Sequence, residues 1–180
     1  RLSFQITTPY DNLKDVLIIL QEEAIKAGLE LRVEVLDATA AFKKMQEKNH
    51  DIAFSAWNVS PEMLPRYWET LHSANAYDKA FLPDGSVNPA RKVKTQTNNL
   101  QEIADPQLDQ LIDTYDKSAS IPERKDLAFK IEQFIHDDAS FSPGFVIPFM
   151  RSGSWRWIGW PADGNVKLAT SFTEYSLYWV

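Results

Sequence analysis

Cysteine is absent from the 180 residues of the sequence. This absence excludes disulfide bonds, thiolate metal sites and cysteine nucleophiles. Oxidising compartments are therefore permitted, although the sequence does not require one. Glycine is also scarce: only 6 residues occur, and none cluster after a strand pattern. The sequence therefore contains no glycine-rich loop of the kind that binds nucleotide phosphates.

Positive charge and long apolar runs are scarce too. The formal net charge is -6 at pH 7, and basic neighbours such as Arg91-Lys92-Val93-Lys94 are too few for the basic face that nucleic acids require. The longest apolar run, Val16 to Leu20, is too short to span a bilayer. The first four residues lack the basic and then apolar order of a signal peptide. The chain is therefore either cytoplasmic or a mature or trimmed piece, and its start without Met on an apparent strand favours the trimmed piece.

Strand and helix patterns alternate through the first sixty residues, in a composition typical of a globular domain. In a predicted second helix, Phe42 and Met45 are expected to face the core. This β-α-β-α-β order predicts an α/β fold with a mostly parallel sheet flanked by helices. The predicted elements are a strand over 2–8, a helix from Asp11 or Asn12 to Gly28, a strand over 29–36, a helix capped by Asp37 or Thr39, and a strand over 51–57.

The pattern weakens between residues 58 and 106 and then returns as two helices. A short helix is predicted after Pro65 and a turn at Pro83-Asp84-Gly85, and a loop of this length typically carries function or is mobile. Residues 105–115 and 120–135 read as capped amphipathic helices, and Ser120 with Glu123 forms a capping box. Further strands are predicted over 145–150, 155–160 and 172–180.

Catalysis finds little support in the sequence. His50, His72 and His136 are far apart, and none has a partner at metal-ligand spacing. The adjacent carboxylates Asp137 and Asp138 would point apart on a helix. We therefore expect no enzyme, no metal and no cofactor, with a hydrolase kept as an outside alternative.

Aromatic residues make up 12% of the sequence and suggest a binding surface. Trp155 and Trp157 would share one face of a strand, either as core packing or as the wall of a ligand site. Trp57 lies at the carboxyl end of the third predicted strand, where ligands collect in α/β sheets. It is either a core plug or a flat surface over a ligand.

Two polar stretches follow Trp57. Residues 66–76 mix a guanidinium group, aromatic rings and amides, which can bind a peptide carboxylate or backbone, and residues 95–99 are rich in neutral donors and acceptors. The alternative interpretations are an ordinary helix surface for residues 66–76 and a plain polar loop for residues 95–99.

Three stretches together resemble the second lobe of extracellular solute-binding proteins of family 5, the dipeptide/oligopeptide-binding type. They are residues 23–35, residues 51–57, and residues 105–112 with the following helix and Phe145-Val-Ile-Pro148. The resemblance spans nearly the whole chain in order and spacing. Residues 65–69, 72–76, 97–99 and 178–180 are most similar to the Yej-type branch, which feeds peptides and the peptide-nucleotide antibiotic microcin C to an ABC importer.

The resemblance implies a periplasmic receptor whose two lobes close over a ligand, with ABC permease subunits as partners and membrane contact only through them. This chain would be a single lobe of a type II periplasmic-binding-protein fold. Residues 1–150 would form the ligand-binding lobe, and residues 151–180 would form strands returning toward the missing first lobe. An oligosaccharide receptor is the main alternative, and a transcriptional sensor of the same architecture is a lesser one.

The ligand would be a peptide, or a peptide-nucleotide, bound in extended form without chemical conversion. Ser60 stands where oligopeptide binders of the family carry an Asp that pairs with the α-amino group of the peptide. We hypothesise that the amino end of the ligand is blocked, as in a formylated peptide, or is held elsewhere. The predicted ligand-binding residues are Trp57, Asn58, Ser60, Arg66, Tyr67, Asn98 and Asn99.

Overall fold

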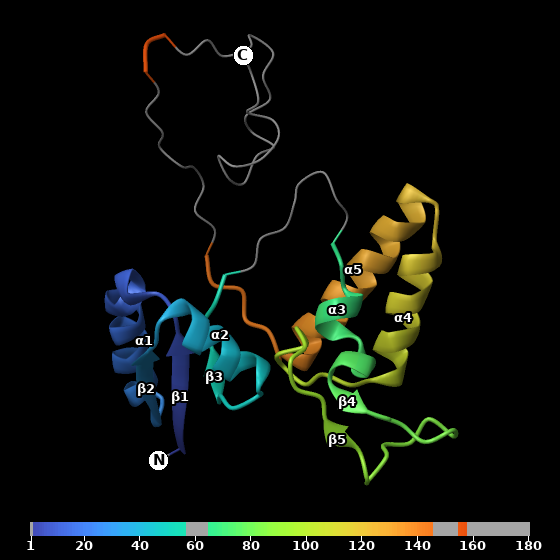
Figure 1. The fold of residues 1–180 in the computed structure, drawn as a ribbon, viewed down its shortest axis with the longest axis horizontal. Coiled ribbons are helices and arrows are strands. Elements are labelled where there is room, and N and C mark those ends of the chain that lie inside the picture. The colour runs from blue at the N-terminus through green and yellow to red at the C-terminus, as the bar shows by residue number, and fades with distance from the viewer. Residues whose placement is uncertain (1, 57–64, 146–154, 158–180) are drawn as a thin grey trace.

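A three-stranded parallel sheet forms the first part of the fold. The computed structural model describes residues 2–56, 65–145 and 155–157 (Figure 1). The central strand β1 (Leu2–Thr8) pairs with β2 (Leu29–Val35) on one side and with β3 (Ile52–Ala53) on the other. Helices α1 (Lys14–Lys26) and α2 (Ala38–Gln46) connect these strands. The α/β prediction is confirmed.

The two faces of this sheet differ in polarity. In the register of β1 and β2, Ile6 lies beside Val33 and Thr7 lies beside Glu34, so apolar and polar pairs alternate between the faces. Ile6 is buried on the apolar face. On the polar face, the Lys44 ammonium group of α2 donates to the Glu34 carboxylate over 2.5 Å. The Thr7 hydroxyl donates to the same carboxylate over 3.0 Å.

The helix ends follow local sequence signals, with one exception. Gly28 follows α1 with a φ of +84°, and the Asp37 carboxylate caps α2 by accepting from the amides of Thr39 and Ala40. The predicted cap at Asp11 or Asn12 is wrong, because a 3-10 turn (Asp11–Leu13) precedes α1 and Leu13 takes the cap position without a side-chain bond.

Only one of the two predicted inward residues of α2 is buried. Met45 is 1% exposed and packs with Ala41 and Leu100, whereas Phe42 is 49% exposed. The prediction for Phe42 is wrong because the buried stripe runs from Ala41 to Met45, four residues on, and Phe42 lies one position off that stripe.

Helices dominate the second part of the fold. The short helix α3 (Trp68–Leu71) and a 3-10 turn (Ser73–Asn75) lead into a small antiparallel pair, β4 (Tyr77–Asp78) with β5 (Lys92–Val93). Figure 1 shows α4 (Pro106–Lys117) and α5 (Ile121–Asp138) side by side, with α3 against them. Their shared core consists of Tyr67, Leu71, Ile103, Leu108, Ile112, Tyr115, Leu127, Ile131 and Ile135.

Both long helices begin at the residues that the sequence indicates. The Asp105 carboxylate accepts from the amides of Gln107 and Leu108, and the Ser120 hydroxyl accepts from the amide of Glu123. The Glu123 carboxylate does not complete the expected capping box, because it accepts a hydrogen bond from the Ser118 hydroxyl instead.

The predicted C-terminal strands lie largely outside the described residues. Phe145 and Trp155 have no regular structure, and residues 156–157 form a turn, so the strand prediction is wrong for those positions. The rings of Trp155 and Trp157 stack with centroids 5.0 Å apart, and both are exposed. Predictions for 146–150, 158–160 and 172–180 fall on residues that the structure does not describe. None of the helices in the described part of the chain combines the length and hydropathy that crossing a membrane requires.

Candidate ligand-binding site

An aromatic pair lies at the carboxyl edge of the parallel sheet. Tyr10 follows β1 and Phe54 follows β3, and their half-buried rings meet edge to face with centroids 6.4 Å apart. The amide of Phe54 donates to the carbonyl of Thr7 over 2.9 Å, which extends the pairing one residue beyond β3. The described residues end at Ala56, two positions after Phe54, at the edge where parallel sheets collect ligands.

Three of the predicted binding residues lie outside the described residues. They are Trp57, Asn58 and Ser60. Their roles as ligand contacts therefore stay predictions. The structure does describe both borders of this stretch, at Ala56 and Pro65.

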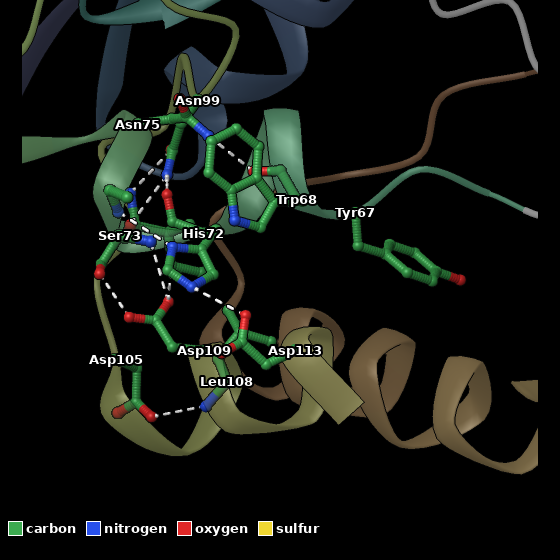
Figure 2. A network of polar contacts seen from close by, with 12 residues as sticks. Tyr67, Trp68, His72, Ser73, Asn75, Asn99, Asp105, Leu108, Asp109 and Asp113 are labelled. Carbon is green, nitrogen blue, oxygen red and sulfur yellow. Dashed lines mark hydrogen bonds and ion pairs between the residues drawn. The ribbon is translucent and has the colours of Figure 1, made fainter. Parts of the chain in front are cut away.

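The structure brings the two predicted polar stretches together. The amide of Lys94 donates to the carbonyl of Ala76 over 2.8 Å, and the Thr97 hydroxyl donates to the carbonyl of Asn75. Figure 2 shows Asn99 beside the turn that carries His72 and Asn75. Residues 72–76 and 94–99 thus form one polar junction.

Asn99 lies at the centre of this junction and is fully buried. Its side-chain nitrogen donates to the carbonyl of Ile103 over 2.9 Å and to that of His72 over 3.2 Å. Its side-chain oxygen accepts from the amide of Ile103 over 3.0 Å. Asn98 is half-buried, and its side-chain oxygen accepts from the Gln46 amide group over 3.3 Å. The described contacts of both residues hold the chain together, and their contact with a ligand stays a prediction.

Tyr67 is also buried, and it points away from the junction (Figure 2). Its hydroxyl donates to the Glu132 carboxylate of α5 over 2.7 Å. Burial, with help from the Glu132 carboxylate, raises the pKa of the Tyr67 hydroxyl well above its usual range, so this group stays protonated. Its role as a ligand contact stays a prediction.

Arg66 is exposed beside a shallow concavity on the surface of α3 and α4. Its guanidinium group is 3.9 Å from the Glu69 carboxylate. The concavity is lined by Arg66, Trp68, Glu69 and Asp116.

Acidic residues of α4 complete the junction, and the sequence analysis missed them. The Asp109 carboxylate accepts from both the amide and the hydroxyl of Ser73. The His72 ring lies between two carboxylates, with Nδ1 3.7 Å from Asp109 and Nε2 3.5 Å from Asp113. Asp109 and Asp113 lie four residues apart, which places them on one side of α4, and this spacing was the available signal.

The side chains of His72, Ser73 and Asp109 make structural contacts. Nδ1 of His72 accepts from the amide of Ala74 over 3.1 Å, and the Ser73 hydroxyl is used by Asp109. Among residues 2–56, 65–145 and 155–157, no three or more His, Cys, Asp or Glu side chains are arranged so that they could hold a metal ion.

Comparisons with known proteins identify the fold. No family model and no curated protein matches the sequence. Among solved structures, the periplasmic binding protein DppA from Helicobacter pylori, in complex with peptide STSA, is similar at 18% identity and a TM-score of 0.61. The oligopeptide-binding protein AppA from Bacillus subtilis, in complex with a nonapeptide, is similar at the same values, and NikZ from Campylobacter jejuni, in complex with Ni(L-His), at 20% and 0.57.

Each similarity covers 77% of this chain but only 24%, 24% and 25% of the three other proteins, respectively. The chain thus spans about a quarter of the length of these structures. The chain has the α/β architecture of a fragment of a periplasmic binding protein, with helices flanking a parallel sheet.

Proposed function

We propose that this chain is one lobe of the substrate-binding component of an ABC peptide importer. The observation that carries the proposal is the carboxyl edge of the sheet. There the Tyr10–Phe54 pair borders the stretch that contains Trp57, in a fold shared with peptide-bound periplasmic binding proteins. An extended oligopeptide would bind there, between this lobe and a second one.

Binding requires no bond to be made or broken. Trp57 would cover one side of the peptide, and Asn58, Ser60, Arg66, Tyr67, Asn98 and Asn99 would supply polar contacts. Ligand shifts the equilibrium toward the closed form because it makes better contacts there. The permease subunits would then recognise the closed shape.

The finer assignment rests on the resemblance of the sequence to the Yej-type branch of family 5. It would make the protein periplasmic and would include peptide-nucleotides such as microcin C among its ligands. Residues 1–150 would form the ligand-binding lobe, and residues 151–180 would return toward the other lobe.

Copurification identifies the class of ligand. The intact receptor is purified without refolding, and the small molecules released from it by acid are identified by mass spectrometry. We expect peptides, and calorimetry with a synthetic copy of the most abundant peptide should reproduce its binding. Release of oligosaccharides would favour the sugar receptor, and hydrolysis of the peptide during incubation would favour an enzyme; either result overturns the proposal.

The serine at position 60 leads to a second experiment on the same receptor. We propose that the amino end of the peptide is blocked or is held away from Ser60. Calorimetry compares one peptide in its free and its N-formylated form, and we expect the formylated form to bind at least as tightly. A strong preference for the free amine would contradict this proposal without affecting the proposal of peptide binding.

A further inference from the structure

A hollow of about 490 Å³ lies along the solvent side of α2, between this helix and the loop before α4. It is lined by Ala38, Thr39, Phe42, Lys43, Gln46 and Gln96. Only Leu36 and Asp37 separate the last residue of β2 from the first residue of α2. The end of the hollow at Ala38 therefore lies at the carboxyl edge of the sheet, where α2 starts in Figure 1.

The loop that borders the hollow is fastened to the last turn of α2. The amide of Gln96 donates to the carbonyl of Gln46 over 2.9 Å, and the Gln46 side-chain nitrogen donates to the Asn98 side chain over 3.3 Å. The Lys48 ammonium group donates to the carbonyl of Thr97 over 3.1 Å. Both glutamines are therefore held at the same end of the hollow before any ligand binds.

Gln96 adopts a backbone conformation that glycine would adopt more easily. Its φ is +61°, in the left-handed region that is unfavourable for a residue with a Cβ. A glycine at this position would relieve the strain but would bring no side chain to the hollow. The amide side chain of Gln96 is thus placed on the border of the hollow at a cost in backbone energy.

The described lining of the hollow contains one cation and no carboxylate. The Lys43 ammonium group is 3.8 Å from Glu47, and both side chains are exposed, so this weak pair leaves Lys43 available to an anion. The adjacent ring of Phe42 is 49% exposed and offers an apolar surface. This combination fits a negatively charged group beside an apolar side chain, and it does not fit a free amine.

The two glutamines add the chemistry of a peptide group. The side-chain oxygen of Gln46 can accept from a peptide N–H, and the side-chain nitrogen of Gln96 can donate to a peptide carbonyl. A peptide group, an apolar side chain and a carboxylate occur together in the last residue of a peptide. The hollow therefore matches the carboxyl end of a peptide in all three respects.

We propose that the hollow on α2 binds the carboxyl-terminal residue of the peptide and selects an apolar side chain there. Lys43 pairs with the terminal carboxylate, and Phe42 contacts the side chain. This inference rests on the proposed function and goes further by naming the end of the peptide and its chemistry. An ion pair with a largely exposed lysine is modest, so its loss should lower affinity about five-fold.

Calorimetry on the intact receptor tests the role of Lys43. The probe is the synthetic copy of the copurifying peptide, made with leucine as its last residue and with either a carboxylate or a carboxamide at its end. We expect the wild type to bind the carboxylate form about five-fold more tightly. Lys43→Met should bind both forms equally, whereas the control Lys125→Met, at an exposed position of α5, should keep the wild-type difference.

A second variant tests the apolar contact. The same peptide is compared with leucine and with glycine as its last residue, and Phe42→Ala should reduce the preference for leucine about three-fold. Phe129→Ala, at an exposed position of α5, is the matched control and should keep the preference. Melting temperatures equal to the wild type show that these surface variants are folded.

The remaining outcomes separate this inference from the proposed function. If the wild type binds the carboxylate and the carboxamide equally, or if Lys43→Met keeps the wild-type difference, the inference fails and peptide binding stands. An unchanged preference for leucine in Phe42→Ala would also overturn it. If the wild-type receptor binds none of these peptides, the proposed function itself fails.

Discussion

The ammonium group of Lys48 donates a hydrogen bond to the main-chain carbonyl of Asn99 over 2.6 Å. The same group also donates to the main-chain carbonyl of Thr97 over 3.1 Å. These bonds attach the loop before α4 to the residues that follow α2. Together with the packing of Leu100 on Met45, this partly buried lysine links the two parts of the fold.

Replacing Lys48 with Met should therefore destabilise the protein. The variant leaves the carbonyls of Thr97 and Asn99 without their charged donor, and we expect a loss of about 2 kcal/mol in the free energy of unfolding. Urea denaturation measures it. Lys43→Met is the control, because Lys43 forms only an exposed ion pair with Glu47; an equal loss in both variants would contradict the prediction.

Mild acid should weaken the fold through His50. Burial, followed by the nearby charge of Lys48, lowers the pKa of His50 below its ordinary value of 6.5, and its Nδ1 is buried without a hydrogen-bond partner among the described residues. As the pH falls through 6.5, the unfolded chain takes up a proton that the folded chain does not, so stability declines. His50→Gln should reduce the fall in melting temperature between pH 7 and 5.5, and the exposed His136→Gln should not.

A glycine pair offers a test of backbone conformation. Gly85 has a φ of +83° with nothing within 4 Å of an added Cβ, and Gly144 also has free space but no positive φ. Gly85→Ala should therefore cost about 1 kcal/mol through strain alone. Gly144→Ala should be neutral within about 0.5 kcal/mol. Thermal denaturation measures the melting temperatures of both variants. Equal values would contradict the prediction that strain at Gly85 destabilises the alanine variant.

Glu34 should stabilise the protein in its ionised form. The hydrogen bond from Lys44 is the main cause that holds the pKa of Glu34 below 4.5. Its contribution is present above pH 4.5 and disappears as the pH falls through the folded-state pKa. Glu34→Gln should cost about 1 kcal/mol at pH 7, and the difference from wild type should shrink below pH 4.5. Glu30→Gln, which breaks only an exposed pair with Arg32, is the control.

Local signals predicted the elements well, and contacts distant in sequence decided the rest. Asp105 and Gly28 were recognisable because a cap or a positive φ depends on a few neighbouring residues. The sequence pattern predicts loop surface at Asn99, yet Asn99 is buried, because tertiary packing brings the carbonyl of His72, 27 residues away, to its side chain.

Tyr67 is a comparable case, since its hydroxyl finds Glu132 on a helix 65 residues away. The wrong prediction that Phe42 faces the core also arises because tertiary packing is not visible in the sequence. Sequence periodicity identifies an amphipathic helix, but the neighbour that packs against it decides which of two adjacent apolar side chains is covered. In α2 that neighbour is Leu100, which packs with Met45.

The polar face of the parallel sheet favours one register of β1 against β2. If β1 slipped by one residue along β2, Ile6 would turn toward the Lys44 ammonium group, while Thr7 would leave the Glu34 carboxylate for an apolar environment. Misaligned chains would therefore bury a charge against hydrocarbon during folding. The cluster of Thr7, Glu34 and Lys44 thus favours the observed alignment of β1 and β2.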